Sequence, residues 1–365
     1  MIDLDHLNAN TCGLLFVGDP HVWSHKPGRR RDHYLSTICG KLEQIVEISN
    51  RDRLWVVILG DLFHQAEDNN LAMISRLSAI FQQFERKPIV LVGNHDLTEQ
   101  TLTQGTVLEV FHSVGLILTM MENKPFARVT LQTDEGEKRI VLGGTPYGFD
   151  APKNLQAFFK GKTAEELKKD AKADTIIWLT HDDYAFDHTY PNAVPLHPIV
   201  GVDMVINGHI HGYQKPIMVG DTAWYNPGNI ARISIDLMDQ VVAVWSFTGA
   251  HKREMASNDV EIPRLTQIPL KHAKGSDVMS LEGYHTKKAQ EAGEISSKPQ
   301  THENVGSLFV AQLQEEEHQR KTDEGVLLRE TLDDEYRLTE TPEHIKKIVD
   351  HLFEQTILRH QQGLS

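Results

Sequence analysis

The sequence predicts a layered α/β sandwich, and two observations carry this prediction. Between residue 13 and about residue 244, short apolar runs alternate with stretches in which apolar residues recur at helical spacing. Five of the apolar runs end directly at polar side chains that can bind a metal ion. In open α/β sheets, ligands bind beyond the carboxyl ends of the strands, so we expect these five strand ends to converge on one site.

Each element has its own signal in the chain. The expected strands cover residues 14–18, 54–60, 88–93, 175–180 and 202–207, and they lead into Asp19, Asp61, Asn94, His181 and the pair Gly208 and His209. Apolar residues at every third or fourth position predict helices over residues 34–49, 70–84 and 102–114. Residues 126–133 and 139–143 flank a turn at 134–136, which predicts a hairpin. A later antiparallel series, residues 223–225, 230–235 and 241–247, is expected to form the second sheet.

Composition excludes several classes of protein. The 365 residues carry 37 Lys and Arg against 51 Asp and Glu, a formal charge of −14, and 40% of them are hydrophobic. The apolar runs are far shorter than the ~18 residues of a membrane span, and the N-terminal residues lack the pattern of a signal peptide. The cysteines Cys12 and Cys39 cannot build a disulfide framework and suit a reducing compartment. We therefore expect a soluble cytoplasmic protein with no membrane partner, in which any DNA binding is local because the chain is acidic.

The chain changes character near residue 274, which predicts three parts. Residues 1–270 hold the strand-end side chains, residues 271–304 predict a linker or partly disordered segment, and residues 305–365 predict a helical C-terminal region. In the last part, Thr341-Pro342-Glu343 is typical of a helix start, and an apolar stripe follows at Ile345, Ile348, Val349, Leu352, Phe353 and Ile357. This helix either packs on its own domain or binds a partner, and the stripe leaves both interpretations open.

The strand-end side chains form an ordered set of motifs. These are Asp19-Pro20-His21, Gly60-Asp61-Leu62-Phe63-His64, Gly93-Asn94-His95-Asp96, His181 and Gly208-His209-Ile210-His211. A single histidine of this kind is most often structural, but six of the twenty histidines at strand ends beside two carboxylates indicate a metal site. Mixed nitrogen and oxygen ligands suit Mn, Fe or Zn, and the lack of cysteine ligands argues against a structural zinc site. Two cations about 3.5–4 Å apart can clamp an in-line displacement at phosphorus.

This set of motifs resembles the calcineurin-like metallophosphoesterase superfamily over residues 13–235. The resemblance implies a four-layer α/β/β/α sandwich of two mixed β-sheets flanked by helices, with a small C-terminal helical appendage. It also implies two metal ions: the first held by Asp19, His21, Asp61 and His211, the second by Asp61, Asn94, His181 and His209, with Asp61 bridging. The expected catalytic residues are His95 as general acid, Asp96 as its orienting partner, and His64.

Within the superfamily, three segments resemble the SbcD-type DNA double-strand-break repair nucleases. They are Gly60-Asp61-Leu62-Phe63-His64, residues 225–232 with their Pro-Gly turn and arginine, and Ile268-Pro269-Leu270-Lys271. The resemblance implies an exonuclease or endonuclease of DNA repair, recombination or replication that uses two divalent ions, with Mn ahead of Fe, Zn and Mg. It also implies a homodimer and an SbcC-type ATPase that docks through the C-terminal helix. Pro20 inside the first motif and the lack of a DNA-capping domain depart from the branch and suit a compact, phage-encoded version acting in the host cytoplasm.

Basic residues near the motifs are the expected contacts for the substrate. Four positive charges fall within residues 26–31, directly after two expected ligands, and could guide a phosphodiester toward the metals. The expected substrate-binding residues are Arg29, Arg30, Arg31, Asn229 and Arg232. One alternative is a phosphodiesterase of nucleotides, cyclic nucleotides or other small phosphoesters, which the charge of −14 favours. A second is a non-catalytic binding module, against which the complete ligand set argues.

Overall fold

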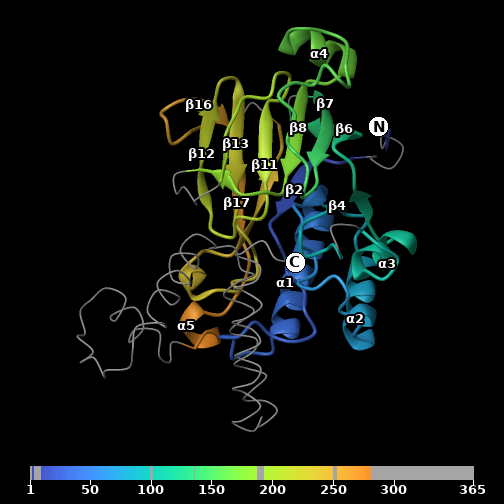
Figure 1. Cartoon of the computed structure of the whole chain (residues 1–365), viewed down its shortest axis with the longest axis vertical. Helices are drawn as coiled ribbons and strands as arrows, with labels where there is room; N and C mark the ends of the chain where they lie inside the picture. The colour runs from blue at the N-terminus through green and yellow to red at the C-terminus, as the bar shows by residue number, and fades with distance from the viewer. Residues whose placement is uncertain are drawn as a thin grey trace, which may run out of the picture. The chain divides into compact units, whose positions relative to one another are not determined.

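Two large mixed β-sheets stack face to face in this protein (Figure 1). The structure is a computed structural model, and it describes residues 2–3, 10–98, 102–134, 136–186, 193–249 and 253–280. The six-stranded sheet has the order β17 (Thr266–Pro269), β14 (Ala243–Phe247), β2 (Gly13–Val17), β3 (Leu54–Ile58), β4 (Ile89–Leu91) and β5 (Leu118–Met120). The strands from β2 to β5 run parallel, and β14 is antiparallel to both of its neighbours.

The seven-stranded sheet is also mixed. Its order is β1 (Ile2–Asp3), β6 (Lys124–Thr133), β7 (Gly136–Thr145), β8 (Thr175–Thr180), β11 (Met204–Asn207), β13 (Thr222–Asn226) and β12 (Gln214–Val219). Strands β6 and β7 form the expected antiparallel hairpin, and β7, β8, β11 and β13 run parallel. Two short pairs complete the strands of the described chain: β9 (Tyr184–Ala185) with β10 (Val194–Pro195), and β15 (Arg253–Met255) with β16 (Glu261–Pro263).

Alternating side chains of the central strands fill three layers of core. In β2, Leu14 and Phe16 pack in the core between the sheets, whereas Leu15 and Val17 pack on the opposite face with Ile38 of the first helix. Because both faces of the strand are covered, all five residues of β2 are buried. The strand β8 does the same in the other sheet, with its Trp178 on the outer face.

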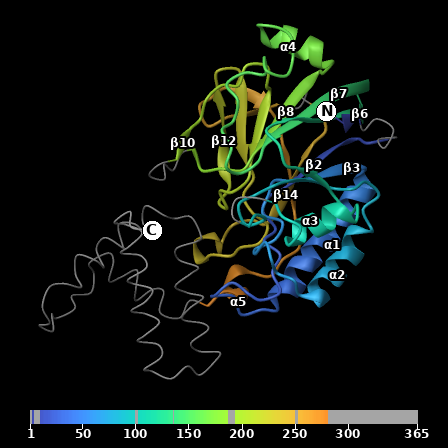
Figure 2. The same cartoon turned by 45° about the vertical axis from the view of Figure 1, so that its right-hand side comes forward.

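Helices cover the outer face of each sheet, which confirms the predicted four-layer sandwich. The helices α1 (Tyr34–Asp52), α2 (Leu71–Phe81) and α3 (Val107–Ser113) lie together beside β2 and β3 (Figure 2). On the other sheet, the buried Leu167 of α4 (Ala164–Ala171) joins the outer core that contains Trp178, and the ring of Phe158 stacks on Trp178. The side chain of Thr163 and that of Glu166 form a capping box at the start of α4, a signal that the sequence analysis did not use.

The predicted antiparallel series over residues 223–247 is wrong as one sheet. Its first part lies in β13 of the seven-stranded sheet, its last part lies in β14 of the six-stranded sheet, and residues 230–234 form no strand. Cationic side chains donate to the backbone carbonyl groups that would otherwise accept hydrogen bonds from a neighbouring strand. Lys41 of α1 donates to the Ile230 carbonyl at 2.5 Å, and Arg30 donates to the carbonyls of Ala231 and Arg232 at 3.0 and 3.1 Å.

The described chain continues past residue 270 as ordered structure. Residues 271–280 contain α5 (Gly275–Val278) and the fully buried Met279, which packs with Ile235. The backbone of Arg31 donates to the Val278 carbonyl at 2.8 Å, so this segment lies against the basic residues that follow His21. The rest of the predicted linker, the C-terminal region 305–365 and its expected helix lie outside the described residues. Within the described part of the chain, no helix is both long and apolar enough to cross a membrane.

The buried Lys41 makes stability depend on pH. Burial, with the nearby Arg30 and Arg232, lowers the pKa of Lys41 to about 7 from 10.5. Between these values the unfolded chain binds one proton more than the folded protein, so stability rises with pH by up to about 1.4 kcal/mol per unit. We expect Lys41→Met to flatten this rise when denaturant unfolding is compared near pH 7 and near pH 9. The exposed Lys153→Met is the control, and an unchanged slope in Lys41→Met would contradict the assignment.

Candidate metal centre

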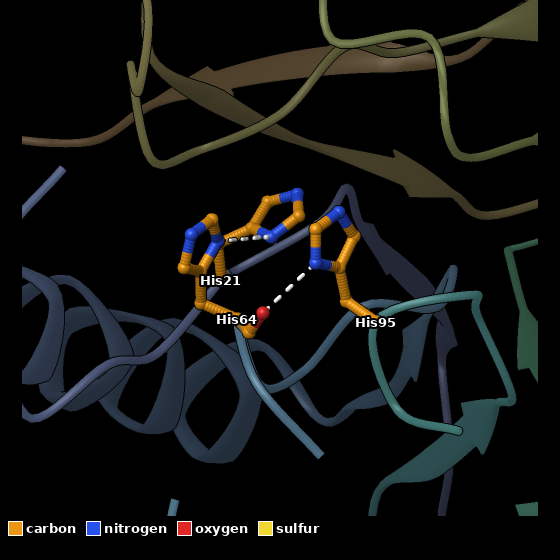
Figure 3. Close-up of side chains that lie close together, drawn as sticks. All are labelled: His21, His64 and His95. Atoms are coloured by element: carbon orange, nitrogen blue, oxygen red, sulfur yellow. Dashed lines mark hydrogen bonds between the residues drawn. The ribbon is translucent and has the colours of Figure 1, made fainter. Parts of the chain in front are cut away.

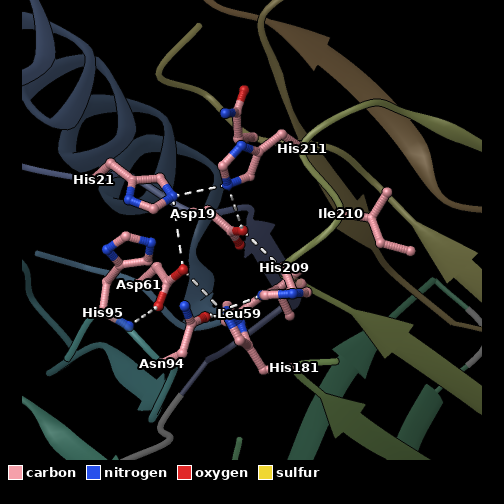
Figure 4. Close-up of polar contacts among 12 residues, drawn as sticks. Asp19, His21, Leu59, Asp61, Asn94, His95, His181, His209, Ile210 and His211 are labelled. Atoms are coloured by element: carbon pink, nitrogen blue, oxygen red, sulfur yellow. Dashed lines mark hydrogen bonds and ion pairs between the residues drawn. The ribbon is translucent and has the colours of Figure 1, made fainter. Parts of the chain in front are cut away.

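Five parallel strand ends bring all seven predicted metal ligands together (Figure 4). Asp19 and His21 follow β2, Asp61 follows β3, Asn94 follows β4, His181 follows β8, and His209 and His211 follow β11. Three groups of side chains converge closely enough to hold a metal ion. Asp19, His21, Asp61 and His211 form the first cluster, Asp61, His181 and His209 form the second cluster, and the third group is the imidazoles of His21, His64 and His95. Asp61 belongs to both clusters.

The first cluster joins the ends of β2, β3 and β11. The Nε2 atoms of His21 and His211 are 2.9 Å apart. His211 Nε2 also lies 3.6 Å from Asp19 Oδ2, and His21 Nε2 lies 3.6 Å from Asp61 Oδ2. Two ligands that each lie about 2.0–2.1 Å from one ion are separated by about 3–3.5 Å, so these spacings suit a shared cation.

The second cluster is closed by the amide of Asn94. Its Oδ1 atom lies 3.1 Å from His181 Nε2 and 3.0 Å from His209 Nδ1. Asp61 Oδ2 completes the group at 3.2 Å from His181 Nε2. The same oxygen therefore faces imidazole nitrogens of both clusters, as a bridging carboxylate must.

Close backbone approach around Asp61 leaves no room for larger residues. A Cβ on Gly93 would lie 2.1 Å from Asp61 Oδ1, and one on Gly208 would lie 2.9 Å from Asp19 Oδ1. Three of the ligand residues adopt left-handed backbone angles that are unusual outside glycine, with φ of 44° at His21, 48° at Asp61 and 68° at His209. Strain of this kind persists only where the surrounding structure enforces it, and it gathers at functional sites.

Two carboxylate oxygens in the centre test whether a cation fits. Asp19 Oδ1 and Asp61 Oδ2 are both buried, and neither has a hydrogen-bond donor in the described structure. Burying an anionic oxygen without a partner is costly, whereas a divalent cation between the clusters would satisfy both atoms. The residues present therefore fit two divalent ions, and the mixed donor set suits transition metals.

Electrostatics favour ionised Asp61 beside neutral His21. Burial raises the pKa of Asp61, but the imidazoles of His181 and His95 outweigh it and hold the pKa well below its usual value. Burial, reinforced by His211, holds the pKa of His21 well below its usual value. Metal ions bind carboxylates and neutral imidazoles, so Asp61 and His21 have the required protonation states. Against the effect of burial, Asp61 raises the pKa of His181 to about 10, so a bound cation would displace a proton from this ring.

The imidazoles are oriented by acceptors behind them. His181 Nδ1 donates to the Leu59 carbonyl at 2.7 Å, which leaves Nε2 to face the second cluster. His21 Nδ1 lies 3.2 Å from His64 Nδ1, while its Nε2 faces the first cluster. Such outer partners fix the tautomer and the ring direction of metal-binding histidines.

The three predicted catalytic residues occupy different positions. His95 and His64 lie with His21 in a group of stacked and edge-on rings (Figure 3). The acceptor for His95 Nδ1 is the His64 carbonyl at 2.8 Å, so Asp96 does not orient this ring as expected. The Asp96 carboxylate instead accepts from the backbone of Phe63 and Gly93, both at 3.1 Å, and ties the β3 and β4 loops together. Burial and the nearby Asp61 raise the pKa of Asp96 to about 7.

The predicted substrate-binding residues separate into two groups. Arg31 is exposed and Arg29 is half-buried. Arg30 and Arg232 are buried, and their guanidinium groups bind Asp32 and backbone carbonyls, so they hold loops together. Asn229 is also buried; its backbone donates to the carbonyl of the ligand His211 at 2.9 Å, and its Nδ2 atom has no hydrogen-bond partner in the described structure.

Sequence reasoning missed Asn207 and Asp183, which border the second cluster. Asn207 is fully buried at the end of β11, where its side chain binds Thr180 and the backbone of Asp182. Asp183 Oδ1 lies 3.5 Å from His209 Nε2. Their positions at strand ends, among the motif residues, were the available signal.

A protein-family model agrees with this geometry. The family model for calcineurin-like phosphoesterases matches residues 14–213, and the chain belongs to this family. No curated protein matches the chain. Among solved structures, the 5'-nucleotidase precursor from Thermus thermophilus matches 77% of this chain at 14% identity and a TM-score of 0.40, and the match spans 57% of that longer protein. The family hydrolyses phosphoesters with divalent metal ions, and the clusters around Asp61 are where this chain would bind them.

The approach of Gly93 to Asp61 gives a direct test of the centre. In Gly93→Ala the new methyl group would collide with the Asp61 carboxylate and displace it from both clusters. We expect metal binding about 10- to 100-fold weaker, measured by metal analysis after dialysis against graded free manganese. Gly40→Ala is the matched control, because its Cβ would meet no atom within 4 Å. Equal metal affinity in Gly93→Ala and the wild type would contradict the bridging geometry.

Proposed function

We propose that this protein is a dinuclear, metal-dependent DNA nuclease of the SbcD type. The observation that carries the chemistry is the Asp61 carboxylate, whose Oδ2 atom is shared by two clusters of ligands. The two clusters would hold two divalent ions, which would supply the positive charge that activates a water and stabilises the departing oxygen of a phosphodiester. The motif Gly60-Asp61-Leu62-Phe63-His64, which resembles that branch, supports DNA as the substrate.

His95 is the residue placed to handle the proton of the leaving group. Its backbone donates to Asp61 Oδ1 at 2.9 Å, and its Nδ1 atom donates to the His64 carbonyl at 2.8 Å. With the Nδ1 proton engaged, Nε2 is the nitrogen that can bind a second proton and pass it to a departing oxygen. Imidazole is the side chain that most often serves as a general acid or base in enzymes.

The basic loop, residues 26–31, is the proposed contact for the DNA backbone. It starts five residues after the ligand His21, and its Lys26 and Arg31 are exposed. Its backbone pairs with residues 278–280: Arg31 donates to the Val278 carbonyl, and Ser280 donates to the Arg29 carbonyl, each at 2.8 Å. A rigid loop with exposed cationic ends can hold a phosphodiester at a fixed distance from the metals.

Manganese, a homodimer and an ATPase partner are further parts of the proposal. The donor set of carboxylate, amide and imidazole groups supports manganese but also accommodates iron, zinc or magnesium. The ATPase is proposed to bind through residues 341–359, which lie outside the described residues, and a host cytoplasm would be the compartment of a phage-encoded enzyme.

Hydrolysis of DNA tests the proposed function. We expect the protein with manganese to cleave end-labelled single- or double-stranded DNA, and His95→Ala to retain both metals while turnover falls about 10²- to 10⁴-fold. A small chromogenic phosphodiester is assayed in parallel. Cleavage of the small ester with intact DNA would overturn the nuclease and favour a nucleotide or other small phosphoester. Normal turnover in His95→Ala would remove His95 from the chemistry.

Salt dependence tests the basic loop. We expect replacement of Arg29 and Arg31 by Ala to weaken DNA binding and to reduce the slope of log affinity against log salt, by about 0.7–0.9 for each phosphate that the loop no longer neutralises. Arg51→Ala is the control, because Arg51 is exposed at the end of α1 and pairs with its neighbour Asp52. The measurement is fluorescence anisotropy with labelled DNA in the presence of calcium. A slope equal to that of the wild type would make the basic loop a plain surface feature.

A further inference from the structure

The two ring nitrogens of His209 face different partners. Nδ1 lies 3.0 Å from Asn94 Oδ1 in the second cluster, and Nε2 lies 3.5 Å from Asp183 Oδ1 on its other side. The ring is largely buried, whereas the Asp183 side chain is 29% exposed. The orientation of the His209 ring therefore depends on the partners of both nitrogens.

Lone pairs converge on the second cluster. His181 Nδ1 donates to the Leu59 carbonyl, so with a cation bound its Nε2 would present a lone pair to that ion, beside Asn94 Oδ1 and Asp61 Oδ2. A cation between these atoms requires His209 Nδ1 to present a lone pair as well. The proton of the neutral His209 ring then resides on Nε2, the nitrogen that faces Asp183.

From this geometry we propose that Asp183 is a positioning residue for the second metal ion. Its carboxylate accepts the Nε2 proton of His209, fixes the tautomer and aims Nδ1 at the metal. Carboxylates behind metal-binding histidines act in this way, and they also make the ligand more basic. The inference rests on the dinuclear site that the proposed function requires, and it is independent of which phosphoester is hydrolysed.

The loop that carries Asp183 is built onto the strand that carries His209. The Asn207 side chain at the end of β11 donates to the Asp182 carbonyl at 3.0 Å and accepts from the Asp182 backbone at 3.3 Å. The Asp183 backbone donates to Asp182 Oδ1 at 2.8 Å, and the Asp183 carbonyl accepts from Val194 at 2.7 Å. Asp183 is therefore fixed relative to His209 by contacts that do not involve its own carboxylate. Removing this carboxylate would leave the loop supported.

Backbone contact on the far side of His209 completes the support. The His209 amide donates to Asp19 Oδ2 at 2.9 Å, which couples this residue to the first cluster. The left-handed φ of 68° at His209 allows this donation while the ring reaches the second cluster. The backbone of His209 thus binds the first cluster, and its side chain lies in the second cluster. Asp183 acts only on the side chain.

Metal binding by the full-length protein tests this assignment without any substrate. We expect Asp183→Ala to bind the second manganese ion about 10- to 100-fold more weakly than the wild type, with the first ion retained. Equilibrium dialysis with elemental analysis gives the stoichiometry at each free manganese concentration. Electron paramagnetic resonance supplies a second readout, because the spin-coupled signal of an adjacent pair of ions gives way to that of a single ion.

Two further variants separate positioning from charge. Asp183→Asn keeps an oxygen that can accept from Nε2, so we expect it to recover most of the lost affinity. Asp182→Asn removes the same charge one residue away and keeps an acceptor for the Asp183 amide, so we expect two ions at near wild-type affinity. If Asp182→Asn weakened binding of the second ion as much as Asp183→Ala does, positioning would be overturned in favour of a general charge effect.

The remaining outcomes also decide the assignment. Asp183→Ala with wild-type affinity for both ions would overturn it. Loss of both ions with a lowered melting temperature of the metal-free protein would show a structural role and would overturn it as well. A failure of the nuclease proposal shows instead as unchanged DNA with a normally loaded wild-type protein, so the two failures are distinguishable.

Discussion

The Asp61 carboxylate sets the constraint that the rest of the centre satisfies. Its Oδ2 atom is buried without a hydrogen-bond donor in the described structure and lies within 3.6 Å of imidazole nitrogens from two different clusters. Its Oδ1 atom accepts from the His95 backbone. Position 93 must be glycine because any side chain there would collide with this carboxylate, and Asp61 itself adopts a left-handed backbone with a φ of 48°.

Much of the fold and of the ligand set can be predicted from the sequence because each depends on local signals. A parallel strand buried on both faces is a continuous apolar run, and a ligand at its carboxyl end is the next polar residue, as with Val17 and Asp19. The five strand ends converge on one site only if the two sheets stack face to face, as the predicted sandwich requires. The residues 14–213 that match the family model contain all of them.

The features that could not be predicted from the sequence depend on contacts between segments that lie far apart in the chain. Residues 230–235 have the composition of a strand, yet Lys41 and Arg30 from the other end of the chain bind their carbonyls. The same contacts decide the roles of the arginines. In the sequence Arg30 is indistinguishable from Arg29 and Arg31, and only its pairing with Asp32 and residues 231–232 separates a loop anchor from a surface cation. Asp96 illustrates the same limit, because proximity to His95 in sequence did not make it the partner of that ring.

The histidines of the centre differ in what stands behind them, and this difference bears on how each metal is held. His181 is backed by a neutral carbonyl and His21 by another imidazole, whereas His209 is backed by a carboxylate. A carboxylate acceptor strengthens the electron donation of the ring more than a carbonyl does, so the exposed side of the second cluster has the more basic ligand. Asp183 is also the most exposed of these acceptors, and solvent can reach it while Leu59 and His64 stay buried. The second cluster therefore combines a buried half around His181 with a more accessible half around His209.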